Sequence, residues 1–459
     1  MTISREQSRT VFKDLKPLLT GNLILPGDAT YHDACQLWNG SVDKHPAALA
    51  RCANAQDVAR TVRWARAQGL ALSVRGGGYD FAGRALCEQG IVIDCSEMRT
   101  VTIDAQNQTA QVQGGATVGD LIHAAQQAGL ATAIGNVEGV GLAGLTLGGG
   151  YGPLVGRFGL VADNLLSAQV VTADGQIVMA SADEHADLWW GLRGGGGNFG
   201  VVVSSQYRLY PLGNVLAGLV MYPLPQAREV LNFYREFIAT APDELTVLSG
   251  FFQMPDGTPI LFFLPTYCGD PAEGERVLKP LRSFGQPLAD QIHLTPITEI
   301  NPYESALTPK GRHYFFQTQS METLRPEAIE ALVGMAETFT SPFSAITIHH
   351  FHGAASRVAV SETAFAPRQD HQIVEIAAVW ESPSPEEGRR HTRWAQAGSH
   401  SLASYALPGG YVSLLGEDEQ ERVPLAFGPN YERLLALKRT YDPDDIFHST
   451  VGHIAPTMA

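Results

Sequence analysis

The chain has 459 residues, which is more than one hydrophobic core usually organises, so two domains are expected. Hydrophobic residues make up 44% and charged residues 17%, a composition typical of a globular rather than a disordered chain. The formal net charge of −15 argues against nucleic acid binding, and no apolar run reaches the ~18 residues that a membrane-spanning helix needs.

The first half of the chain predicts short helices and strands separated by glycine. Apolar residues recur at helical spacing over 57–65, and Gly69 is placed to end that helix. A buried strand is predicted directly after it, over 70–75. Further strands are predicted at 90–94, 101–104, 109–113 and 201–207, a helix at 118–128, and a hairpin over 169–179 around Asp174-Gly175. Residues 1–212 are therefore expected to form an α+β domain.

The second half has a different pattern. Helices predicted at 228–240 and 326–339 alternate with long apolar strands, of which 260–264 and 373–380 are examples. This pattern predicts a second α+β domain over 213–405. The last segment, 406–459, returns to a helix at 431–441, which Asp442-Pro443 ends.

Three glycine clusters stand out in the first domain, at 75–79, 139–152 and 193–200. Consecutive glycines lose much conformational freedom on folding, so each cluster needs a structural reason. Tight turns alone are one reason; the other is a backbone that approaches a ligand closely, with amides forming a nest that suits a pyrophosphate. Three clusters in one domain favour the ligand.

One cluster contains a literal GxGxxG motif, Gly139 to Gly144. That motif indicates a dinucleotide site only where a strand precedes it and a helix follows it. Here Asn136-Val137-Glu138 comes before it, and the Leu147-Gly-Gly-Gly run after it is poorly tolerated in a helix. A Rossmann-type NAD site is therefore not expected.

Taken in order, the motifs resemble the FAD-linked oxidases of the berberine-bridge-enzyme-like group, in the vanillyl-alcohol-oxidase superfamily. The matching stretches are Trp38-Asn39, Asp57-Val58, Val74 to Gly78, Ile93-Asp94, Gly114-Gly115-Ala116, Leu147 to Gly152, Arg157 to Asn164, Asp187 to Gly195, Asn430-Tyr431, Leu434, Lys438, Tyr441-Asp442-Pro443 and Phe447. The resemblance implies a PCMH-type FAD-binding domain, with its core at about 46–212, completed by 406–459. It also implies that 213–405 is an inserted substrate domain whose antiparallel sheet covers the flavin.

The resemblance further implies which residues surround the cofactor, with the nest of Gly76, Gly77 and Gly78 on the pyrophosphate. The complete set is Arg75, Gly76, Gly77, Gly78, Tyr79, Asp80, Gly83, Val137, Gly139, Val140, Gly141, Gly144, Gly149, Gly150, Gly197, Asn198, Gly200, Val202, Tyr411 and Ser413. For Arg75, as for Lys438, a structural role and a contact with the flavin phosphates both stay open.

Two departures from the family concern the bond between protein and flavin. Many members tether FAD through a histidine after the RGGG run and through a cysteine in the next cluster; this chain has Tyr79 and Val137 there. Neither side chain forms those bonds, so FAD is expected to be non-covalent. Val140 stands where a small residue lets oxygen reach the flavin in the family, which favours oxygen as the electron acceptor.

Glu375 is the strongest candidate for a catalytic base, because it interrupts the apolar strand 373–380 and a carboxylate is costly to bury without purpose or partner. A structural ion pair with Arg357 or Arg368 is the alternative. Tyr151 and Tyr411 match active-site tyrosines of the family. A tyrosine of ordinary pKa near 10 is a poor base, so both are candidates either for catalysis or for lining the site.

Three histidines, His349, His350 and His352, lie close together in the sequence. Adjacent residues of a strand face opposite sides, so His349 and His350 cannot converge on one metal, and no metal site is expected. His350 and His352 share a face and are expected to line the substrate pocket.

The five cysteines and the N-terminus bear on location. The number of cysteines is odd and the sequence has no CxxC motif, which fits neither a disulfide framework nor a zinc site. The first twenty residues lack the apolar stretch of a secretory signal. A cytoplasmic protein with reduced, mostly buried thiols is expected.

Together these features predict an oxidase that moves a hydride from a small organic substrate (an alcohol, an amine or a related carbon centre) to FAD and then to oxygen. A dehydrogenase with another acceptor, or a flavin-binding protein without activity, are the alternatives. The oligomeric state is left open.

Overall fold

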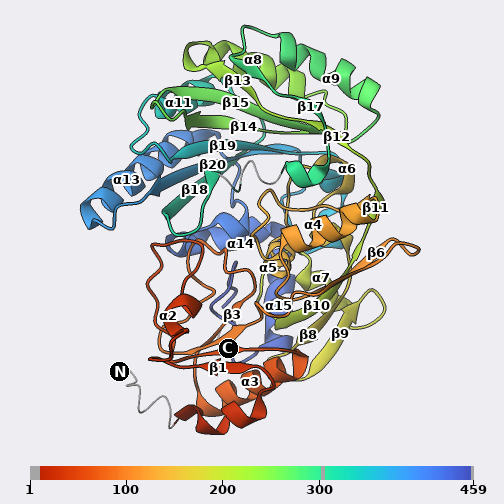
Figure 1. Ribbon diagram of the computed structural model, residues 1–459, viewed down its shortest axis with the longest axis vertical. Helices are drawn as coiled ribbons and strands as arrows, with labels where there is room; N and C mark the ends of the chain where they lie inside the picture. Colours follow the sequence, from red (N-terminus) through yellow and green to blue (C-terminus); the bar gives the residue numbers. More distant parts are fainter. Residues whose placement is uncertain (1–10, 301–304, 306, 456–459) are drawn as a thin grey trace.

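The computed structural model describes residues 11–300, 305 and 307–455 of the chain. Figure 1 shows two parts, an upper one built on a large sheet with helices on its outer side and a lower one built on smaller sheets. The smaller sheets have four, five and two strands. The first described strands and the last long helix, α15, both lie in the lower part, so segments far apart in the sequence build it together. The expected domain limits at residues 1 and 459 fall outside the described residues.

The first small sheet has the order β1-β2-β4-β3, in which β2, β4 and β3 run parallel. Helix α3 (Ala55–Gln68) packs on this sheet, begins where the Asn54 side chain accepts a hydrogen bond from Asp57 N, and ends at Gly69 with φ of 62°. The strands are β1 (Asn22–Ile24), β2 (Ala48–Arg51), β3 (Leu72–Arg75) and β4 (Ile91–Asp94). The first glycine cluster directly follows the end of β3.

The second small sheet is antiparallel, with the order β5-β6-β10-β8-β9. Its strands are β5 (Val101–Asp104), β6 (Thr109–Gln113), β8 (Leu165–Val171), β9 (Ile177–Ser181) and β10 (Val201–Arg208). Helix α4 (Val118–Gln127) begins with a capping box formed by Thr117 and Asp120. The other elements of this region are α2 (Tyr31–Ala34), β7 (Leu130–Ala131), α5 (Leu142–Leu147), α6 (Val155–Phe158), α7 (Ala186–Leu192) and β11 (Tyr210–Pro211).

The large sheet has nine strands, and its main path runs β16-β13-β15-β14-β19-β20-β18, with all described pairs antiparallel. The strands are β12 (Val215–Ala217), β13 (Val220–Pro223), β14 (Leu245–Gln253), β15 (Pro259–Tyr267), β16 (Ala289–Asp290), β17 (His293–Thr295), β18 (His313–Met321), β19 (Ala345–Phe351) and β20 (His371–Trp380). Its outer face forms one hydrophobic core with α8 (Ala227–Ile238), α9 (Pro271–Ser283), α11 (Pro326–Ala336) and α13 (Pro385–Leu402). Its inner face is turned towards the lower part of the molecule.

The C-terminal segment returns to the lower part through α14 (Val423–Phe427) and α15 (Tyr431–Tyr441), which packs against α7. Lys438 on α15 is fully buried; its Nζ lies 2.7 Å from Asp442 and 2.8 Å from Asp445 and donates to the carbonyl of Asn198. Lys438 therefore joins the C-terminal segment to the third glycine cluster. Of the two roles considered from the sequence, a structural one and a contact with the flavin phosphates, these contacts are structural.

Most predicted elements coincide with observed ones, with ends that differ by a few residues. The GxGxxG stretch opens a short helix, α5, but the nearest preceding strand, β7, ends well before it at Ala131, and α5 ends at Leu147 before the glycine run. The Rossmann arrangement is therefore absent at this motif. The helices of the described residues include none with the length and apolar character of a membrane span.

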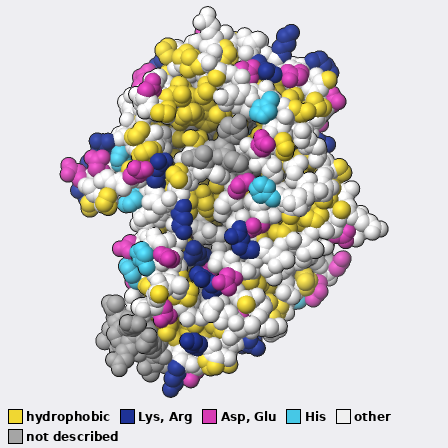
Figure 2. All heavy atoms as spheres, in the orientation of Figure 1, with side chains coloured by type: hydrophobic (Ala, Val, Ile, Leu, Met, Phe, Trp, Pro, Cys, Tyr) yellow, Lys and Arg dark blue, Asp and Glu magenta, His cyan; other side chains and the backbone are white. Residues whose placement is uncertain are grey.

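The visible surface carries charges of both signs, whereas the thiols are buried. Figure 2 shows acidic and basic side chains interspersed over the visible face. All five cysteines fall within the described residues, and all are buried and unpaired. Burial raises the pKa of the Cys95 thiol to about 12, so it stays protonated at neutral pH.

Candidate active site

A cavity of about 480 Å³ lies between the inner face of the large sheet and the glycine clusters of the lower part. This volume is within the range of ~300–1,000 Å³ that small-molecule and cofactor pockets occupy. Residues from all three clusters and from strands β18, β19 and β20 line it. The cavity therefore joins the part expected to hold the flavin to the part expected to hold the substrate.

The glycines at the cavity serve two different purposes. A Cβ on Gly77 would lie 2.5 Å from the backbone N of Gly141, and a Cβ on Gly141 would lie 2.5 Å from the N of Gly77. Two loops thus touch backbone to backbone, which only glycine allows. A Cβ on Gly144, in contrast, would meet no protein atom within 4 Å, although this residue borders the cavity. Gly144 therefore leaves room for a ligand rather than for protein.

The structure places most of the predicted cofactor residues at the cavity wall. Those that line it are Gly76, Gly77, Gly78, Tyr79, Asp80, Val137, Val140, Gly141, Gly144, Gly197, Gly200, Val202, Tyr411 and Ser413. Six others lie behind the wall, namely Arg75, Gly83, Gly139, Gly149, Gly150 and Asn198. Contact with FAD stays a prediction for both groups, and only the first group borders the cavity directly.

Two of the six are occupied by protein contacts. The Arg75 guanidinium donates to the carbonyls of Ala34 and Gln36, which fixes the loop before β2. The Asn198 amide donates to Gly195 and Gly452, and its Oδ1 accepts from the N–H of Ile454. Both side chains therefore hold segments of the fold together.

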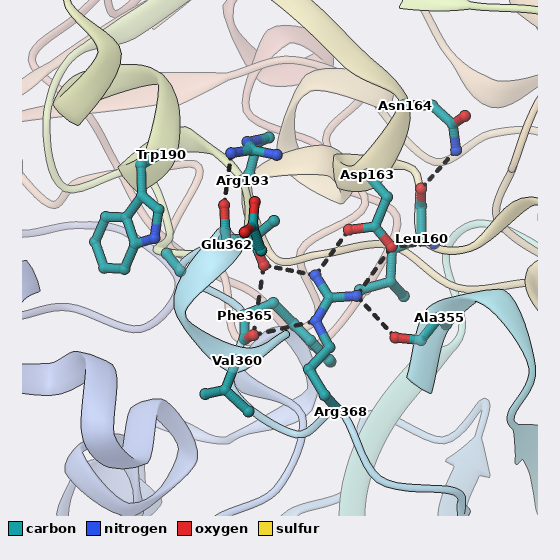
Figure 3. Close-up of polar contacts among 12 residues, drawn as sticks. Leu160, Asp163, Asn164, Trp190, Arg193, Ala355, Val360, Glu362, Phe365 and Arg368 are labelled. Atoms are coloured by element: carbon teal, nitrogen blue, oxygen red, sulfur yellow. Dashed lines mark hydrogen bonds and ion pairs between the residues drawn. The ribbon is translucent and has the colours of Figure 1, made fainter. Parts of the chain in front are cut away.

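Gly149 makes room for a side chain of the segment between β19 and β20. A Cβ on Gly149 would lie 2.6 Å from the Phe365 ring, and one on Gly194 would lie 2.5 Å from Phe365 Cβ. Figure 3 shows what holds Phe365 there: Arg368 donates to the Phe365 carbonyl and pairs with both carboxylate oxygens of Asp163, at 2.7 and 2.9 Å. Packing of Phe365 between the two parts therefore requires a glycine at position 149.

The partners of two arginines decide the alternative role of Glu375. Arg368 pairs with Asp163 (Figure 3). Arg357 pairs with Asp243 at the surface. Neither arginine pairs with Glu375, so the structural ion pair considered from the sequence is wrong.

We expect Arg368→Met to lower the free energy of unfolding by about 3–5 kcal/mol, because the largely buried carboxylate of Asp163 would lose the cation that pairs with both its oxygens. The Arg368 side chain is 3% exposed and that of Asp163 12%. Urea unfolding followed by tryptophan fluorescence measures the change. Arg357→Met is the matched control, since its pair with Asp243 is exposed and such pairs contribute about 0–1 kcal/mol. Equal losses in the two variants would contradict the prediction.

Glu375 lies on β20 with its side chain at the cavity. The residues directly opposite it are Thr318 on β18 and Thr347 on β19. Burial raises the pKa of Glu375 to about 7, because a carboxylate loses hydration in this apolar surrounding. Within the described residues it makes no ion pair, so its charge state responds to what the cavity contains.

Tyr411 and Tyr151 lie side by side at the other edge of the site. The Tyr411 hydroxyl accepts a 3.1 Å hydrogen bond from the N–H of Gly150, and the two rings meet edge to face at 4.9 Å. Burial raises the pKa of Tyr411. Both residues border the cavity, and Tyr411 stays protonated at neutral pH.

His349 is the histidine that faces the cavity, next to Tyr151. Its Nδ1 lies 3.2 Å from Asn136 Nδ2 and its Nε2 lies 2.9 Å from Thr347 Oγ1. Burial lowers the pKa of His349 to about 3, so the ring is neutral at physiological pH.

His350 and His352, which the sequence placed at the substrate pocket, do not border this cavity, and their contact with a substrate stays a prediction. Their rings stack on each other at 3.7 Å, and His350 borders an adjoining cavity of about 20 Å³ that shares Asn136 and Tyr151 with the large one. The register that pairs Thr347 with Glu375 puts odd-numbered residues of β19 on the side of the large cavity. No cluster of metal ligands occurs in the described part of the chain.

The comparisons with known proteins address the same regions. Residues 46–181 match the family described as "FAD binding domain", and residues 410–452 match "Berberine and berberine like". The chain is 30% identical over 445 residues to YgaK of Bacillus subtilis, described as an uncharacterized FAD-linked oxidoreductase, covering 94% of this chain and 96% of that one. This chain belongs to the berberine-bridge-enzyme-like family of FAD-linked oxidoreductases. The expected family and fold class are confirmed.

Two further relatives of this FAD-linked oxidoreductase carry the name of an oxidase. It is 29% identical over 446 residues to (R)-6-hydroxynicotine oxidase of Paenarthrobacter nicotinovorans, covering 94% of this chain and 95% of that one. The crystal structure of 6-hydroxy-D-nicotine oxidase from Arthrobacter nicotinovorans superposes with a TM-score of 0.88 at 28% identity, covering 95% and 98% of the two chains.

The residues of the oxidoreductase fit an FAD molecule. The open face at Gly144, the glycine run after β3 and the contact of Gly77 with Gly141 form a wall on which backbone amides can reach a diphosphate. The opposite wall, on the large sheet, is mostly apolar and carries Glu375, which suits a ring system and a substrate.

One part of the wall was not anticipated from the sequence. Trp38 stacks between Tyr79 and Tyr314, with ring centroids 4.5 and 3.8 Å apart. Trp38 Nε1 and the Tyr79 hydroxyl both donate to the carbonyl of Thr308. In the oxidoreductase, the residue at the family's tether position is therefore part of an aromatic wall that joins the two parts. Residues 38 and 314 are too far apart in sequence for any local pattern to reveal this contact.

Proposed function

We propose that this FAD-linked oxidoreductase is an oxidase that removes two electrons and two hydrogens from an alcohol, amine or related carbon centre of a small molecule and passes them to oxygen. FAD, when bound, supplies the hydride acceptor. The single observation that carries the proposal is Glu375, a carboxylate without an ion-pair partner in the described residues, at the same cavity as the glycine clusters. We further propose that 1–212 with 406–459 hold the cofactor and that 213–405 supply the substrate side.

The pKa values of the site residues indicate which of them accepts a proton and which donates a hydrogen bond. Glu375, with its pKa near 7, is in part ionised at neutral pH and can accept the proton that the substrate releases. Tyr411 has a raised pKa and is held by Gly150 N–H, so it positions the substrate as a hydrogen-bond donor rather than acting as the base. Tyr151, in edge contact with Tyr411, borders the same space.

Oxygen as the acceptor is supported by Val140, which borders the cavity with a small side chain. Relatives that carry the name of an oxidase add to this support. The test needs no substrate: the holoenzyme is reduced with dithionite, mixed with air-saturated buffer, and followed by flavin absorbance and a peroxidase-coupled dye. Rapid return of the yellow colour with hydrogen peroxide is expected. Slow return of the colour in air, but fast return with a quinone, would indicate a dehydrogenase.

We propose that FAD is held without a covalent bond, because Tyr79 and Val137 occupy the two tether positions. Acid precipitation of the yellow holoprotein is expected to leave all FAD in the supernatant. Tyr79→His, which puts the family's histidine back, is the informative comparison, and some colour is expected to stay with its pellet. A yellow pellet from the unaltered protein would refute the proposal.

A further inference from the structure

The hydrogen bonds of His349 determine which of its nitrogens carries the proton. The Asn136 Nδ2 atom is an amide nitrogen and can only donate, so His349 Nδ1 accepts from it. The ring is buried and neutral and has one proton. That proton is therefore on Nε2, which donates to Thr347 Oγ1 at 2.9 Å.

This arrangement fixes the direction of the Thr347 hydroxyl. A threonine oxygen has one proton to give and two lone pairs. One lone pair accepts from His349, so the proton of Thr347 cannot return to that ring. Among the described residues, Oγ1 has no other hydrogen-bond partner, and Thr347 borders the large cavity. The hydroxyl consequently offers a donor to whatever the cavity contains.

An acceptor stands next to this donor. Glu375 is the residue directly opposite Thr347 in the β19–β20 pair, and directly opposite residues of antiparallel strands have Cβ atoms about 4.5–5.5 Å apart. Both side chains border the cavity. Thr318, opposite Glu375 on the other side, has a buried hydroxyl and does not border it. Only one of the two threonines flanking Glu375 can therefore meet a substrate.

We propose that Thr347 and Glu375 together bind the reacting group of the substrate, and that this group is a hydroxyl. An alcohol oxygen accepts from the Thr347 O–H while its own O–H donates to the Glu375 carboxylate, so both protein groups are satisfied. An ammonium group, the form of an ordinary amine at neutral pH, has donors only and would leave the Thr347 proton unpaired at a desolvated site. The inference rests on the proposed oxidase function and selects alcohols among its substrates.

The chemistry of this pair balances for an alcohol. The O–H proton passes to the Glu375 carboxylate, the hydrogen on the carbon leaves with two electrons, and the C–O bond becomes a carbonyl. In air, oxygen takes up the two electrons and two protons as hydrogen peroxide. The proton held by Glu375 is thereby returned in the second half of the cycle.

The tautomer of His349 is the first test and needs no substrate. Holoenzyme labelled with ¹⁵N-histidine is examined by long-range ¹H–¹⁵N NMR, and the signal of His349 is assigned as the one lost in His349→Gln. A proton on Nε2 is expected. A proton on Nδ1 would make Thr347 the donor to His349 and would overturn the inference.

Matched alcohol and amine pairs are the second test, with benzyl alcohol against benzylamine and 1-phenylethanol against 1-phenylethylamine as probes. Anaerobic bleaching of the flavin is expected to be at least about tenfold faster with the alcohol of a pair, as the loss of one hydrogen bond at a desolvated site implies. Faster bleaching by the amine would overturn the inference.

Thr347→Val is expected to lower the rate with the alcohol about 10- to 100-fold, whereas Thr318→Val keeps it and Thr347→Ser restores most of it. Equal effects of the two valine variants would overturn the inference. A flavin that none of the probes bleaches counts against the proposed function, and the NMR result on the holoenzyme then decides the inference about Thr347 by itself. A protein that binds no FAD also counts against the proposed function, and the same NMR measurement is then made on the protein as purified.

Discussion

Glu375→Gln is expected to lower the rate constant for anaerobic reduction of the bound flavin by about 10²–10⁴-fold, the usual contribution of a general base. Glutamine keeps the size and polarity of the side chain, but its amide cannot take a proton from the substrate. Stopped-flow absorbance of the flavin measures this step separately from the reaction with oxygen. FAD affinity, measured on the same variant, is expected to be little changed.

The pH dependence of kcat/KM tests independently whether Glu375 is the base. Because the pKa of Glu375 is raised to about 7, the carboxylate form becomes dominant as pH rises through that value. The kcat/KM of the unaltered enzyme should therefore increase through about pH 7 and then level off, and Glu375→Gln should lack this limb. Glu387→Gln, an exposed carboxylate on α13 that pairs with Arg390, is the control and should retain it. An unchanged rate in Glu375→Gln would exclude this residue as the base.

Gly144→Val is expected to weaken FAD binding by about 5- to 150-fold, corresponding to the ~1–3 kcal/mol that overfilling a packed site costs. A Cβ at this position would meet no protein atom within 4 Å, so the fold should be retained, but the side chain would fill the space that borders the cavity. Titration of the apoprotein with FAD, followed by flavin fluorescence, measures the affinity, and circular dichroism checks the fold.

Gly213→Val is the matched control for this variant. A Cβ on Gly213 also meets nothing within 4 Å, yet this residue does not border the cavity. It should therefore bind FAD as the unaltered protein does. Equal affinities of the two variants would show that Gly144 is not at the cofactor wall.

Local sequence signals predicted the elements well where the responsible interactions are themselves local. The helix over 57–65 was found from apolar spacing and from Gly69, and the hairpin around Asp174-Gly175 from its turn. Glu375 was predicted as a site residue because it is the charged residue within an otherwise apolar strand. Each of these signals involves residues a few positions apart.

The remaining features depend on contacts between distant segments. Which face of β19 meets the cavity follows from the pairing of Thr347 with Glu375, and no periodicity within β19 contains that information. The same holds for the glycines: Gly144 and Gly149 look alike in sequence, yet one borders a ligand cavity and the other accommodates Phe365. Only the position of Phe365 distinguishes them.

The contact between Arg368 and Asp163 has a consequence for how molecules enter and leave. Arg368 belongs to the connection between β19 and β20, the two strands that carry Thr347 and Glu375, and its buried charge is fixed on the opposite part of the protein. A clamshell movement that swings the large sheet away from the flavin would have to separate this pair, at a cost of several kcal/mol. Substrate and product exchange should therefore proceed by rearrangement of individual side chains at a permanently assembled catalytic chamber, with turnover that does not depend on hinge motion.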